Sequence, residues 1–562
     1  MDIISKLIRK EIADKTWYFP AETVEYAVSD LVDRIKNYAK ILASLGVIKG
    51  DSIGFINNNS SDLICLLYAC WYLNAVAVPL RTNTGKHQVF EEYIERCNDI
   101  CGFKLLILDD DIYTDVFAQW ALVQKQRACS ISQLSAIEAT DDICPVPISP
   151  DDNAIIQFSS GSTGKPKGVI VNHRMMMAQL RNLEELFTAP IGGTPVNSYA
   201  LWAPVNHDMG MFVGVLSPIY QGVNNILAPP AYYMRNPERW FSMMAERKVE
   251  VAMFTNAVLA KSLPALERKA ASNPIDLSHC RIYLGAEKVS PVVIREAYRV
   301  LEPLFGSKNN LYIGYGMAEN ALGTSTTLPG EIPVLRVNAT ADGVLEVLAR
   351  DSVEGNEFAS VGVPYSNNRI TVRNAADKVL PELMLGEINI ESHCLTPGYL
   401  NNPEKTQEVL ADQRFRTGDL GFWYLGQLYF YSRKDDLIIS NGQNIVPDDI
   451  EISVEKLPFI RPDSTVLFAI ESQETGLQLL HLLVEANAGI GSDEIQKRKL
   501  EIISYIFANH GLLVNAVHLC AKGTIEKTSS GKKRRKVIRE RFSNNNIEII
   551  KREEANEFQA AI

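Results

Sequence analysis

A glycine-rich loop with two lysines is the segment of this chain with the clearest chemical potential. It reads Phe158-Ser-Ser-Gly-Ser-Thr-Gly-Lys-Pro-Lys-Gly168, and apolar runs precede and follow it at 154–158 and 169–171. Glycines let the backbone turn so that N–H groups, hydroxyls and ammonium groups surround an anion. The pattern of strand, loop and strand therefore predicts a polyphosphate site. A surface turn is the simpler alternative, although so many hydroxyls, lysines and glycines together are unusual for a hairpin turn.

The same loop does not fit the Walker motif. That motif requires G-x-x-x-x-G-K-[ST] between a strand and a helix. Here Gly164-Lys165 is followed by Pro166 and by a strand-like run. A second Gly-Lys pair, Gly531-Lys532, has Glu526 at the position of the first glycine. The sequence thus excludes a P-loop NTPase.

Two short segments of small residues predict the binding of a flat ring. They are Leu284-Gly-Ala-Glu-Lys288 and Gly314-Tyr-Gly-Met-Ala-Glu319, and each follows an apolar run. Small residues allow a flat ligand to approach closely, and Tyr315 is able to stack on it. The carboxylate of Glu319 suits a Mg²⁺ ion that also binds phosphates. For each segment alone, glycines that merely form turns are an equally good explanation.

Two later segments supply a carboxylate and a lysine. Asp419, in Phe415-Arg-Thr-Gly-Asp-Leu-Gly421, suits vicinal ribose hydroxyls, and Arg433 follows it in the chain. Lys532 ends the run Thr528-Ser-Ser-Gly-Lys532, where a glycine hinge would carry it to a phosphoryl group and neutralise developing charge. Taken singly, a turn residue, a solvated charge and a surface turn explain these residues equally well.

The elements around these segments predict an α/β fold. Helical spacing over 24–46 is followed by strand-like runs at 52–56 and 105–108. Strands that alternate with helices indicate a parallel sheet with crossover helices. Past about residue 330 the sequence becomes β-rich. Four consecutive charged residues at 433–436 then precede a new series of strand-like and helical segments. We therefore expect a separate, smaller C-terminal domain.

Composition narrows the class of protein. The chain has 562 residues, 46% of them hydrophobic and 22% charged, with a net charge of −11. This balance gives no electrostatic support for nucleic-acid binding. Nine cysteines without a CxxC pair predict a reducing compartment.

The apolar stretch 63–80 contains an asparagine and ends in a proline-containing run, so we expect a buried helix and strand rather than a membrane span. No signal-peptide core is evident at the N-terminus, and we predict a cytoplasmic protein without stable membrane insertion.

Four motifs together resemble the adenylate-forming superfamily of acyl/aryl-CoA synthetases, adenylation domains and luciferases. They are 160–168, 314–319, Arg416-Thr-Gly-Asp419 and Lys527-Thr-Ser-Ser-Gly-Lys532, in the order and spacing of that superfamily. Four ordered motifs are far more specific than any one of them. The resemblance implies that ATP and a carboxylate give an acyl-adenylate and pyrophosphate, and that a thiol then takes the acyl group and releases AMP.

Within the superfamily the chain is most similar to the fatty acyl-AMP ligases. Asn206-His-Asp-Met-Gly210 is similar to their HDMG segment, and 442–451 resembles their G-x-N-x-x-P-x-D-I-E run. The segment 330–360 is long, as in members with an inserted motif. The run after Pro79, which reads Leu80-Arg-Thr-Asn-Thr-Gly85, departs from the proline-rich sequence usual there.

The resemblance implies a role for each matching residue. Glu319 would bind Mg²⁺, Asp419 and Arg433 would hold the ribose, and Lys532 would bridge the acyl carboxylate and the α-phosphate. The residues expected around the phosphates are Ser159, Ser160, Gly161, Ser162, Thr163, Gly164, Lys165 and Lys167. Those expected around the rest of the nucleotide are Gly285, Ala286, Glu287, Gly314, Tyr315, Gly316, Met317 and Ala318. The acyl pocket would include His207, which we also expect to take part in catalysis, together with Met211 and Gly214.

The resemblance also implies an architecture. We expect an N-terminal adenylation core over 1–435, with two α/β sheets and a β-rich part, and a mobile α+β domain over 436–545 that carries Lys532. Residues 546–562 would form a polar tail. Asp436 matches the hinge about which the small domain rotates for the second step. Ser432, Asp435 and Glu526 differ from the residues usual in the family, but none replaces a proposed catalytic group.

The acid and its acceptor stay open at this point. A fatty or related acyl carboxylate, activated for a separate acyl carrier protein, is the leading hypothesis, because no carrier domain follows Lys532. Coenzyme A as the acceptor is the first alternative. Activation of an amino acid, with Asp208 against its ammonium group, is the second. A silent relative that only binds a nucleotide is the third, and the joint presence of Glu319, Asp419 and Lys532 argues against it.

Overall fold

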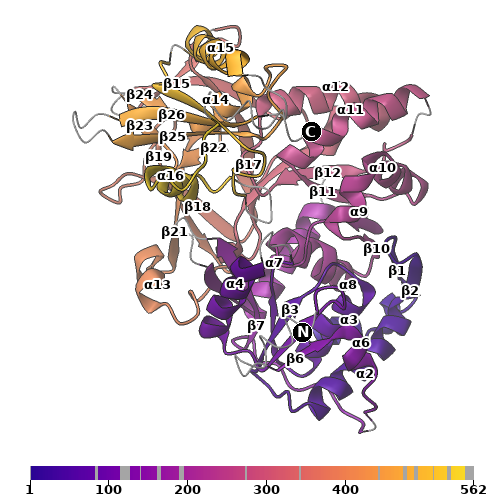
Figure 1. The fold of residues 1–562 in the computed structure, drawn as a ribbon. Coiled ribbons are helices and arrows are strands. Elements are labelled where there is room, and N and C mark those ends of the chain that lie inside the picture. The colour runs from indigo at the N-terminus through magenta and orange to yellow at the C-terminus, as the bar shows by residue number, and fades with distance from the viewer. Residues whose placement is uncertain are drawn as a thin grey trace.

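The computed structural model describes most of the chain. The described residues are 2–82, 87–113, 127–139, 141–160, 166–188, 195–272, 275–340, 343–352, 354–440, 443–471, 478–486, 492–510, 512–527 and 533–550. The fold is α/β, with a large N-terminal part and a smaller C-terminal part, as predicted (Figure 1).

A six-stranded sheet lies at the lower end of the molecule in Figure 1, in the spatial order β6, β5, β3, β4, β7, β8. The strands are β3 (Ser52–Ile56), β4 (Val76–Pro79), β5 (Leu105–Leu108), β6 (Ala128–Ser130), β7 (Asn153–Ser160) and β8 (Pro166–Asn172). All pairings are parallel except that of β7 with β8. β4 and β5 are buried at every residue, as expected of strands covered on both faces.

Helices cover both faces of this sheet. They are α2 (Val28–Ser44), α3 (Ser61–Tyr72), α4 (His87–Cys101), α6 (Ile131–Ser135) and α7 (His173–Thr188), and the short α1 (Ile3–Leu7) precedes them. α2 and α3 pack on alternate residues of β3 and β5, and α4 packs on the others. The apolar stretch 63–80 forms most of α3 and then β4, so the prediction of a buried helix and strand is confirmed.

A second sheet of 16 strands, counted over the described residues, begins with a parallel half. Its strands are β1 (Thr16–Phe19), β9 (Ser198–Leu201), β10 (Asn224–Leu227), β11 (Val251–Thr255), β12 (Arg281–Gly285) and β13 (Leu311–Gly316), with β2 (Val24–Ala27) antiparallel at the edge. The helices of this half are α8 (Ser217–Gln221), α9 (Pro230–Arg235), α10 (Pro237–Glu246), α11 (Asn256–Ser272) and α12 (Pro291–Phe305). The helix predicted from residue 24 therefore begins only at Val28, because 24–27 pair with β1.

The sheet then becomes antiparallel and forms the predicted β-rich part. Its strands are β14 (Gly323–Thr326), β15 (Val334–Ala339), β16 (Leu345–Leu348), β17 (Asn356–Pro364), β18 (Asn368–Arg373), β19 (Gly386–Ser392), β20 (Leu410–Ala411), β21 (Arg414–Tyr424) and β22 (Gln427–Arg433), with helix α13 (Pro403–Val409). The change of direction occurs between β13 and β14. The long segment 330–360 forms the hairpin β15–β16, which pairs with β17.

The C-terminal elements form a small α+β unit at the upper left of Figure 1. They are β23 (Ile438–Ser440), β24 (Gln443–Ile445), α14 (Pro447–Val454), β25 (Thr465–Glu471), β26 (Gln478–Glu485), α15 (Ser492–His510), β27 (Ala516–Cys520) and α16 (Arg535–Ser543). β25, β26 and β27 form a sheet of their own, and its core clusters contain residues from 438 onward. The exact boundaries at 435 and 545 stay predictions.

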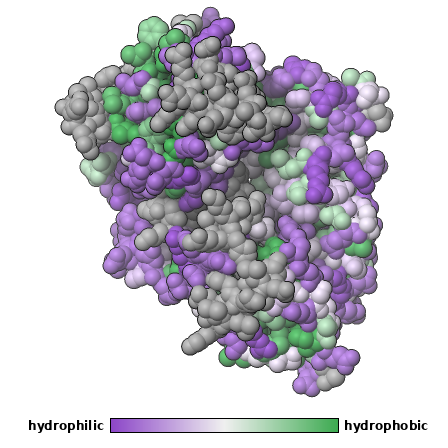
Figure 2. Space-filling view, in the orientation of Figure 1, coloured by the Kyte–Doolittle hydropathy of each residue, from purple (hydrophilic) through white to green (hydrophobic). Residues whose placement is uncertain are grey.

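Hydrophilic residues cover much of the coloured surface in Figure 2, with smaller hydrophobic areas between them. None of the helices in the described part of the chain combines the length and the apolar character that a membrane span needs. The cytoplasmic location stays a prediction.

Candidate active site

A cavity of about 1280 Å³ opens where the parallel half of the large sheet, its β-rich half and the C-terminal unit meet. Its walls include the segments that follow β12 and β13, the ends of β21 and β22, and α14. Ligands of open α/β sheets bind at the carboxyl ends of parallel strands, where the strand order or direction changes. The cavity occupies such a place, because β13 is the last parallel strand before the antiparallel half.

One end of the cavity is organised around the carboxylate of Asp419. Arg433 donates through Nε to its Oδ1 at 3.0 Å, and the Tyr315 hydroxyl donates to its Oδ2 at 2.8 Å. Asp419 and Arg433 face each other across β21 and β22, and the Asp419 side chain is only 6% exposed. Burial, together with the nearby Asp419 charge, raises the pKa of Tyr315, so its hydroxyl stays a donor. A carboxylate has about four acceptor positions, so Asp419 can still accept from two further hydroxyls.

Glycines bring the backbones of the two predicted ring-binding segments close together. A Cβ on Gly285 would lie 3.2 Å from the carbonyl oxygen of Gly314, and one on Gly316 would lie 1.8 Å from that of Leu322. Ala286 adopts the left-handed conformation, with φ 68°. Tyr315 is 9% exposed and lies 6.1 Å from Phe430 between ring centroids. Gly285 to Glu287 and Gly314 to Ala318 all line the cavity, so the structure brings both segments together as predicted.

Glu287, besides lining the cavity, caps the N-terminus of a helix. Its Oε1 accepts from the backbone N–H of Ala257 at 2.6 Å, in the first turn of α11. This contact satisfies one of the helix N–H groups that have no partner inside the helix. The following residue, Lys288, donates to Asp449 of α14 at 2.7 Å and so connects this loop to the C-terminal unit.

Glu319 lies just past β13, in a short 3-10 helix over Ala318–Asn320. Its Oε1 accepts from the hydroxyl of Tyr399 at 2.7 Å. Lys167 of β8 lies over the Tyr399 ring, with its Nζ 5.5 Å from the centroid. Tyr399 was not predicted from the sequence. A proline–glycine turn before a tyrosine, at 397–399, is the local signal that marks it.

The donor set around Glu319 fits a magnesium–nucleotide complex. Mg²⁺ in such sites keeps several waters and is bound through one or two carboxylates plus phosphate oxygens. Glu319 supplies one carboxylate at the cavity wall. In the described part of the chain no three or more His, Cys, Asp or Glu side chains cluster as metal ligands, so a site made of protein groups alone is absent there.

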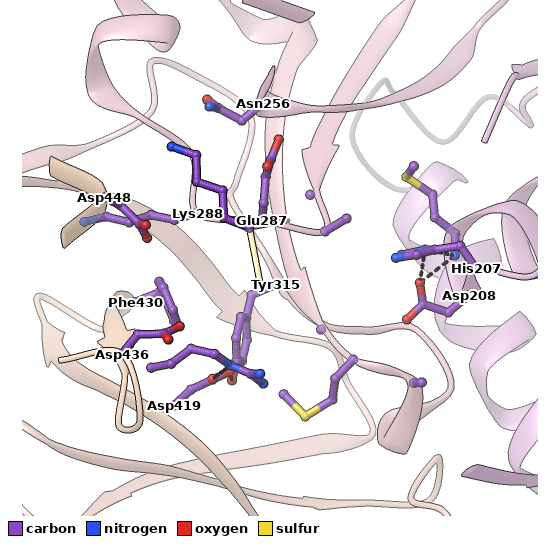
Figure 3. Close-up of a pocket in the computed structure, with 18 of the residues that line it drawn as sticks. His207, Asp208, Asn256, Glu287, Lys288, Tyr315, Asp419, Phe430, Asp436 and Asp448 are labelled. Carbon is purple, nitrogen blue, oxygen red and sulfur yellow. Dashed lines mark hydrogen bonds and ion pairs between the residues drawn. The ribbon is translucent and has the colours of Figure 1, made fainter. Parts of the chain in front are cut away.

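The other end of the cavity carries the predicted His207, shown opposite Tyr315 and Asp419 in Figure 3. Its Nδ1 lies 2.6 Å from Oδ1 of Asp208. Apolar side chains from and near α11, α12 and the ends of the parallel strands also line the cavity, among them Met253, Ala257, Ala260, Val289, Val292, Val293, Ile313 and Leu322. We call these residues the apolar part of the cavity, and they have the character of a pocket for an apolar group.

Met211 and Gly214 do not line this cavity. Both lie in a π-helix, Gly210–Leu216, whose residues are all buried. A Cβ on Gly214 would lie 2.6 Å from Cδ2 of Leu201, because the helix packs directly against the strands. These two residues therefore lie in the core of the described structure, and their acyl-pocket role stays a prediction.

The C-terminal side of the cavity is highly charged. Glu451 of α14, 1% exposed, accepts from Lys533 at 2.8 Å and also from Arg535. Arg535 donates to Asp448 at 2.5 Å and lies 3.8 Å from the predicted hinge residue Asp436. Burial raises the pKa of Asp436. Sequence analysis missed Glu451, although it ends the 442–451 run that carries part of the resemblance.

Some predicted residues fall outside the described part of the chain. They are Gly161, Ser162, Thr163, Gly164, Lys165 and Lys532, and the side chains of Ser159 and Ser160. The strands predicted on either side of the loop are present as β7 and β8, and they pair antiparallel.

Comparisons with known proteins match nearly the whole chain. A family model described as AMP-binding enzyme matches residues 10–400, and one described as the AMP domain of Disco-interacting protein 2-like proteins matches 435–552. A putative acyl-CoA synthetase of Caulobacter vibrioides (strain NA1000 / CB15N) is 28% identical over 526 residues, 91% of this chain and 89% of that protein. The medium-chain-fatty-acid–[acyl-carrier-protein] ligase JamA of Moorena producens (strain JHB) is 28% identical over 513 residues, 86% of this chain and 84% of that protein.

A solved structure supports the same fold. It comes from a study of fatty acyl-adenylate ligases from E. coli and L. pneumophila, and has a TM-score of 0.86 at 24% identity. The superposition covers 97% of this chain and 98% of the other.

Proposed function

The chain belongs to the AMP-binding enzyme family, which confirms the resemblance found in its motifs, and is an adenylate-forming ligase; from this premise we propose its substrates and site. The enzyme uses ATP to convert a fatty or related acyl carboxylate into an acyl-adenylate, with release of pyrophosphate. The acyl group then passes from the adenylate to the phosphopantetheine thiol of a separate acyl carrier protein, and AMP is released.

The observation that carries this proposal is the unequal lining of one cavity. One part has Asp419 with Arg433 and Tyr315, which suit a ribose, and Glu319, which suits a magnesium–phosphate group. Another part has apolar walls from α11 and α12, which suit an acyl chain. The reacting carboxylate and the α-phosphate would meet between them.

The chemistry requires that two anions approach each other. Catalysis must neutralise both and hold them in line. In our proposal Arg433 and Asp419 fix the ribose, Tyr315 stacks on the base, and Lys167 binds phosphate oxygens. Mg²⁺, when bound through Glu319, supplies charge neutralisation at the phosphates. Lys532 bridges the carboxylate and the α-phosphate, and its position on a domain that rotates near Asp436 would free the site for the thiol.

The acceptor separates two candidate functions. The similarity to a fatty-acid–acyl-carrier-protein ligase supports a carrier protein, and the similarity to a putative acyl-CoA synthetase supports coenzyme A as the second candidate. Amino-acid activation has less support, because Asp208, the carboxylate considered for an ammonium group, lies 2.6 Å from His207.

A screen of carboxylic acids by pyrophosphate release tests the proposal. We expect release with ATP and aliphatic acids of a limited range of chain lengths, and loss by a factor on the order of a hundred in Lys532→Ala. The acyl-adenylate formed is then offered either coenzyme A or a phosphopantetheinylated carrier protein. Robust acyl-CoA formation would favour the second candidate, and the absence of pyrophosphate release with every acid would contradict both.

A further inference from the structure

We propose that Tyr399 is a positioning residue, which holds the carboxylate of Glu319 in place for the magnesium–nucleotide complex and keeps it apart from Lys167. This inference rests on the proposed function, because it assigns Glu319 to the metal and Lys167 to the phosphates.

The contact between Tyr399 and Glu319 is short and partly buried. The Tyr399 hydroxyl donates to Oε1 of Glu319 at 2.7 Å, and Tyr399 is 6% exposed. A tyrosine hydroxyl is ordinarily protonated at neutral pH, so it is the donor to this carboxylate. It engages one carboxylate oxygen, and the other makes no hydrogen bond within the described part of the chain.

Tyr399 is fixed by its backbone on both sides. We call residues 396–400 the strap, because they bind two segments that are distant in sequence. The N–H of Thr396 donates to the carbonyl of Glu319 at 2.8 Å, and that of Leu400 donates to Gly168 at 2.8 Å.

Further contacts attach the strap to β8, the strand that follows the phosphate loop. The Thr396 hydroxyl donates to the carbonyl of Ile170 at 2.7 Å, and the N–H of Ile170 donates to Gly398 at 3.1 Å. The strap thus sets the distance between the Glu319 loop and the strand that carries Lys167.

The Tyr399 side chain contacts two opposite charges, Glu319 through its hydroxyl and Lys167 through its ring. Lys167 approaches the ring at 5.5 Å from its centroid, within the range of a cation–π contact. Glu319 and Lys167 form no ion pair with each other among the described side chains. A direct pair would occupy both groups. Tyr399 instead leaves the carboxylate to the metal and the ammonium group to phosphate oxygens.

Tyr399→Phe tests the inference, because it removes the hydroxyl and keeps the ring. Binding of Mn²⁺ to the enzyme with ATP, without any acid, is followed by electron paramagnetic resonance, and the Mg²⁺ concentration for half-maximal pyrophosphate release is measured separately. We expect both to weaken about tenfold, since a hydrogen bond to a charged group is lost. The maximal rate at saturating Mg²⁺ should change less.

Two further variants make the result specific. Tyr431→Phe removes another hydroxyl from a buried tyrosine, 2% exposed and stacked on Phe358, and should leave Mn²⁺ binding unchanged. In a Glu319→Gln background, Tyr399→Phe should weaken Mn²⁺ binding no further, because both act on one contact. If Tyr399→Phe does not fold, Thr396→Val, which removes the bond to Ile170, should weaken Mn²⁺ binding in the same direction but less.

The outcomes separate this inference from the proposed function. Mn²⁺ binding and Mg²⁺ dependence equal to wild type in a folded Tyr399→Phe would overturn it, and so would a lower maximal rate with unchanged metal dependence. Weaker Mn²⁺–ATP binding in the variant would support it even if no acid were activated. In that case the proposed reaction would fail and the positioning role would stand.

Discussion

Two parts of the cavity are built in different ways. In the proposed nucleotide part, Asp419 and Glu319 are each held by a hydrogen bond from a tyrosine far away in sequence, Tyr315 and Tyr399 respectively. In the apolar part, side chains of α11, α12 and the strand ends enclose space through their volume. A hydrogen bond is lost when one atom is removed, whereas the volume of an apolar wall changes gradually with side-chain size. Substitutions should therefore have abrupt effects in the nucleotide part and graded effects in the apolar part.

The largest effect is expected for Asp419→Ala. The variant leaves Arg433 and the Tyr315 hydroxyl without their shared acceptor. A loss of about 3 kcal/mol is expected for hydrogen bonds that involve a charged group, or on the order of a hundredfold in kcat/KM for ATP. Pyrophosphate release over a range of ATP concentrations measures it. Asp419→Asn, which keeps an acceptor oxygen but not the charge, should lose less. An effect on the KM for the acid alone would contradict the assignment.

A second substitution tests how the proposed nucleotide part of the cavity is joined to the C-terminal unit. Lys288 and Asp449 lie 2.7 Å apart with side chains 9% and 18% exposed. Lys288→Met should slow adenylation by about tenfold, since a partly buried charge loses its partner. Exchange of the two charges, with Lys288→Asp and Asp449→Lys together, should restore part of the rate.

The matched control is another pair that crosses the same boundary. Lys261 and Asp463 lie 3.7 Å apart, and the lysine is 44% exposed. Lys261→Met should change adenylation less than threefold, because exposed pairs contribute about 0–1 kcal/mol. Transfer from preformed acyl-adenylate to the thiol should not slow in Lys288→Met. If both lysine variants slowed adenylation equally, the partly buried pair would contribute no more than the exposed one, contrary to this prediction.

The same contrast explains what the sequence could predict. Asp419, Arg433, Tyr315 and Glu319 were predicted because they stand in or near short motifs of small and polar residues that resemble a known family, and the structure brings them to one cavity. Tyr399 and Glu451 were missed because their partners are remote in sequence or lie inside a separate domain. The α/β fold class could be predicted because strand-like runs alternate with helical ones in the sequence. Which strands pair with each other could not be predicted from this alternation.

The residues that line the apolar part of the cavity were harder to predict from the sequence. Met211 and Gly214 were assigned to the acyl pocket through a motif, and the structure packs them into the core. An apolar residue on a helix has the same sequence pattern whether it faces a cavity or a packed neighbour. Only the tertiary arrangement decides which.

In the apolar part of the cavity we expect a graded change in substrate preference. Ala260→Phe should fill space beside α11 and lower kcat/KM for the longest accepted acids by about tenfold, with shorter acids less affected, since one methylene in an apolar pocket is worth about 1–3 kcal/mol. The KM for ATP should stay close to wild type. Gly214→Ala is the control: overpacking against Leu201 should cost about 1–3 kcal/mol of stability, measured as a lower Tm. If Gly214→Ala instead changed which acid chain lengths are accepted, Gly214 would be part of the acyl pocket as the sequence predicted.

The smallest effect concerns the charge of Lys167. Burial, then the nearby Lys405, lowers the pKa of Lys167. A lysine loses its charge as the pH rises through its pKa, so ATP binding through Lys167 should weaken at a lower pH than for an ordinary lysine.

Lys405→Gln removes the like charge, leaves Glu408 without its 2.5 Å partner and raises the pKa of Lys167. The alkaline decline of 1/KM for ATP should therefore move to higher pH. Glu408→Gln should move it to lower pH, because a negative neighbour that raises the pKa of Lys167 is lost. Shifts of both variants in the same direction would show that the decline belongs to another group.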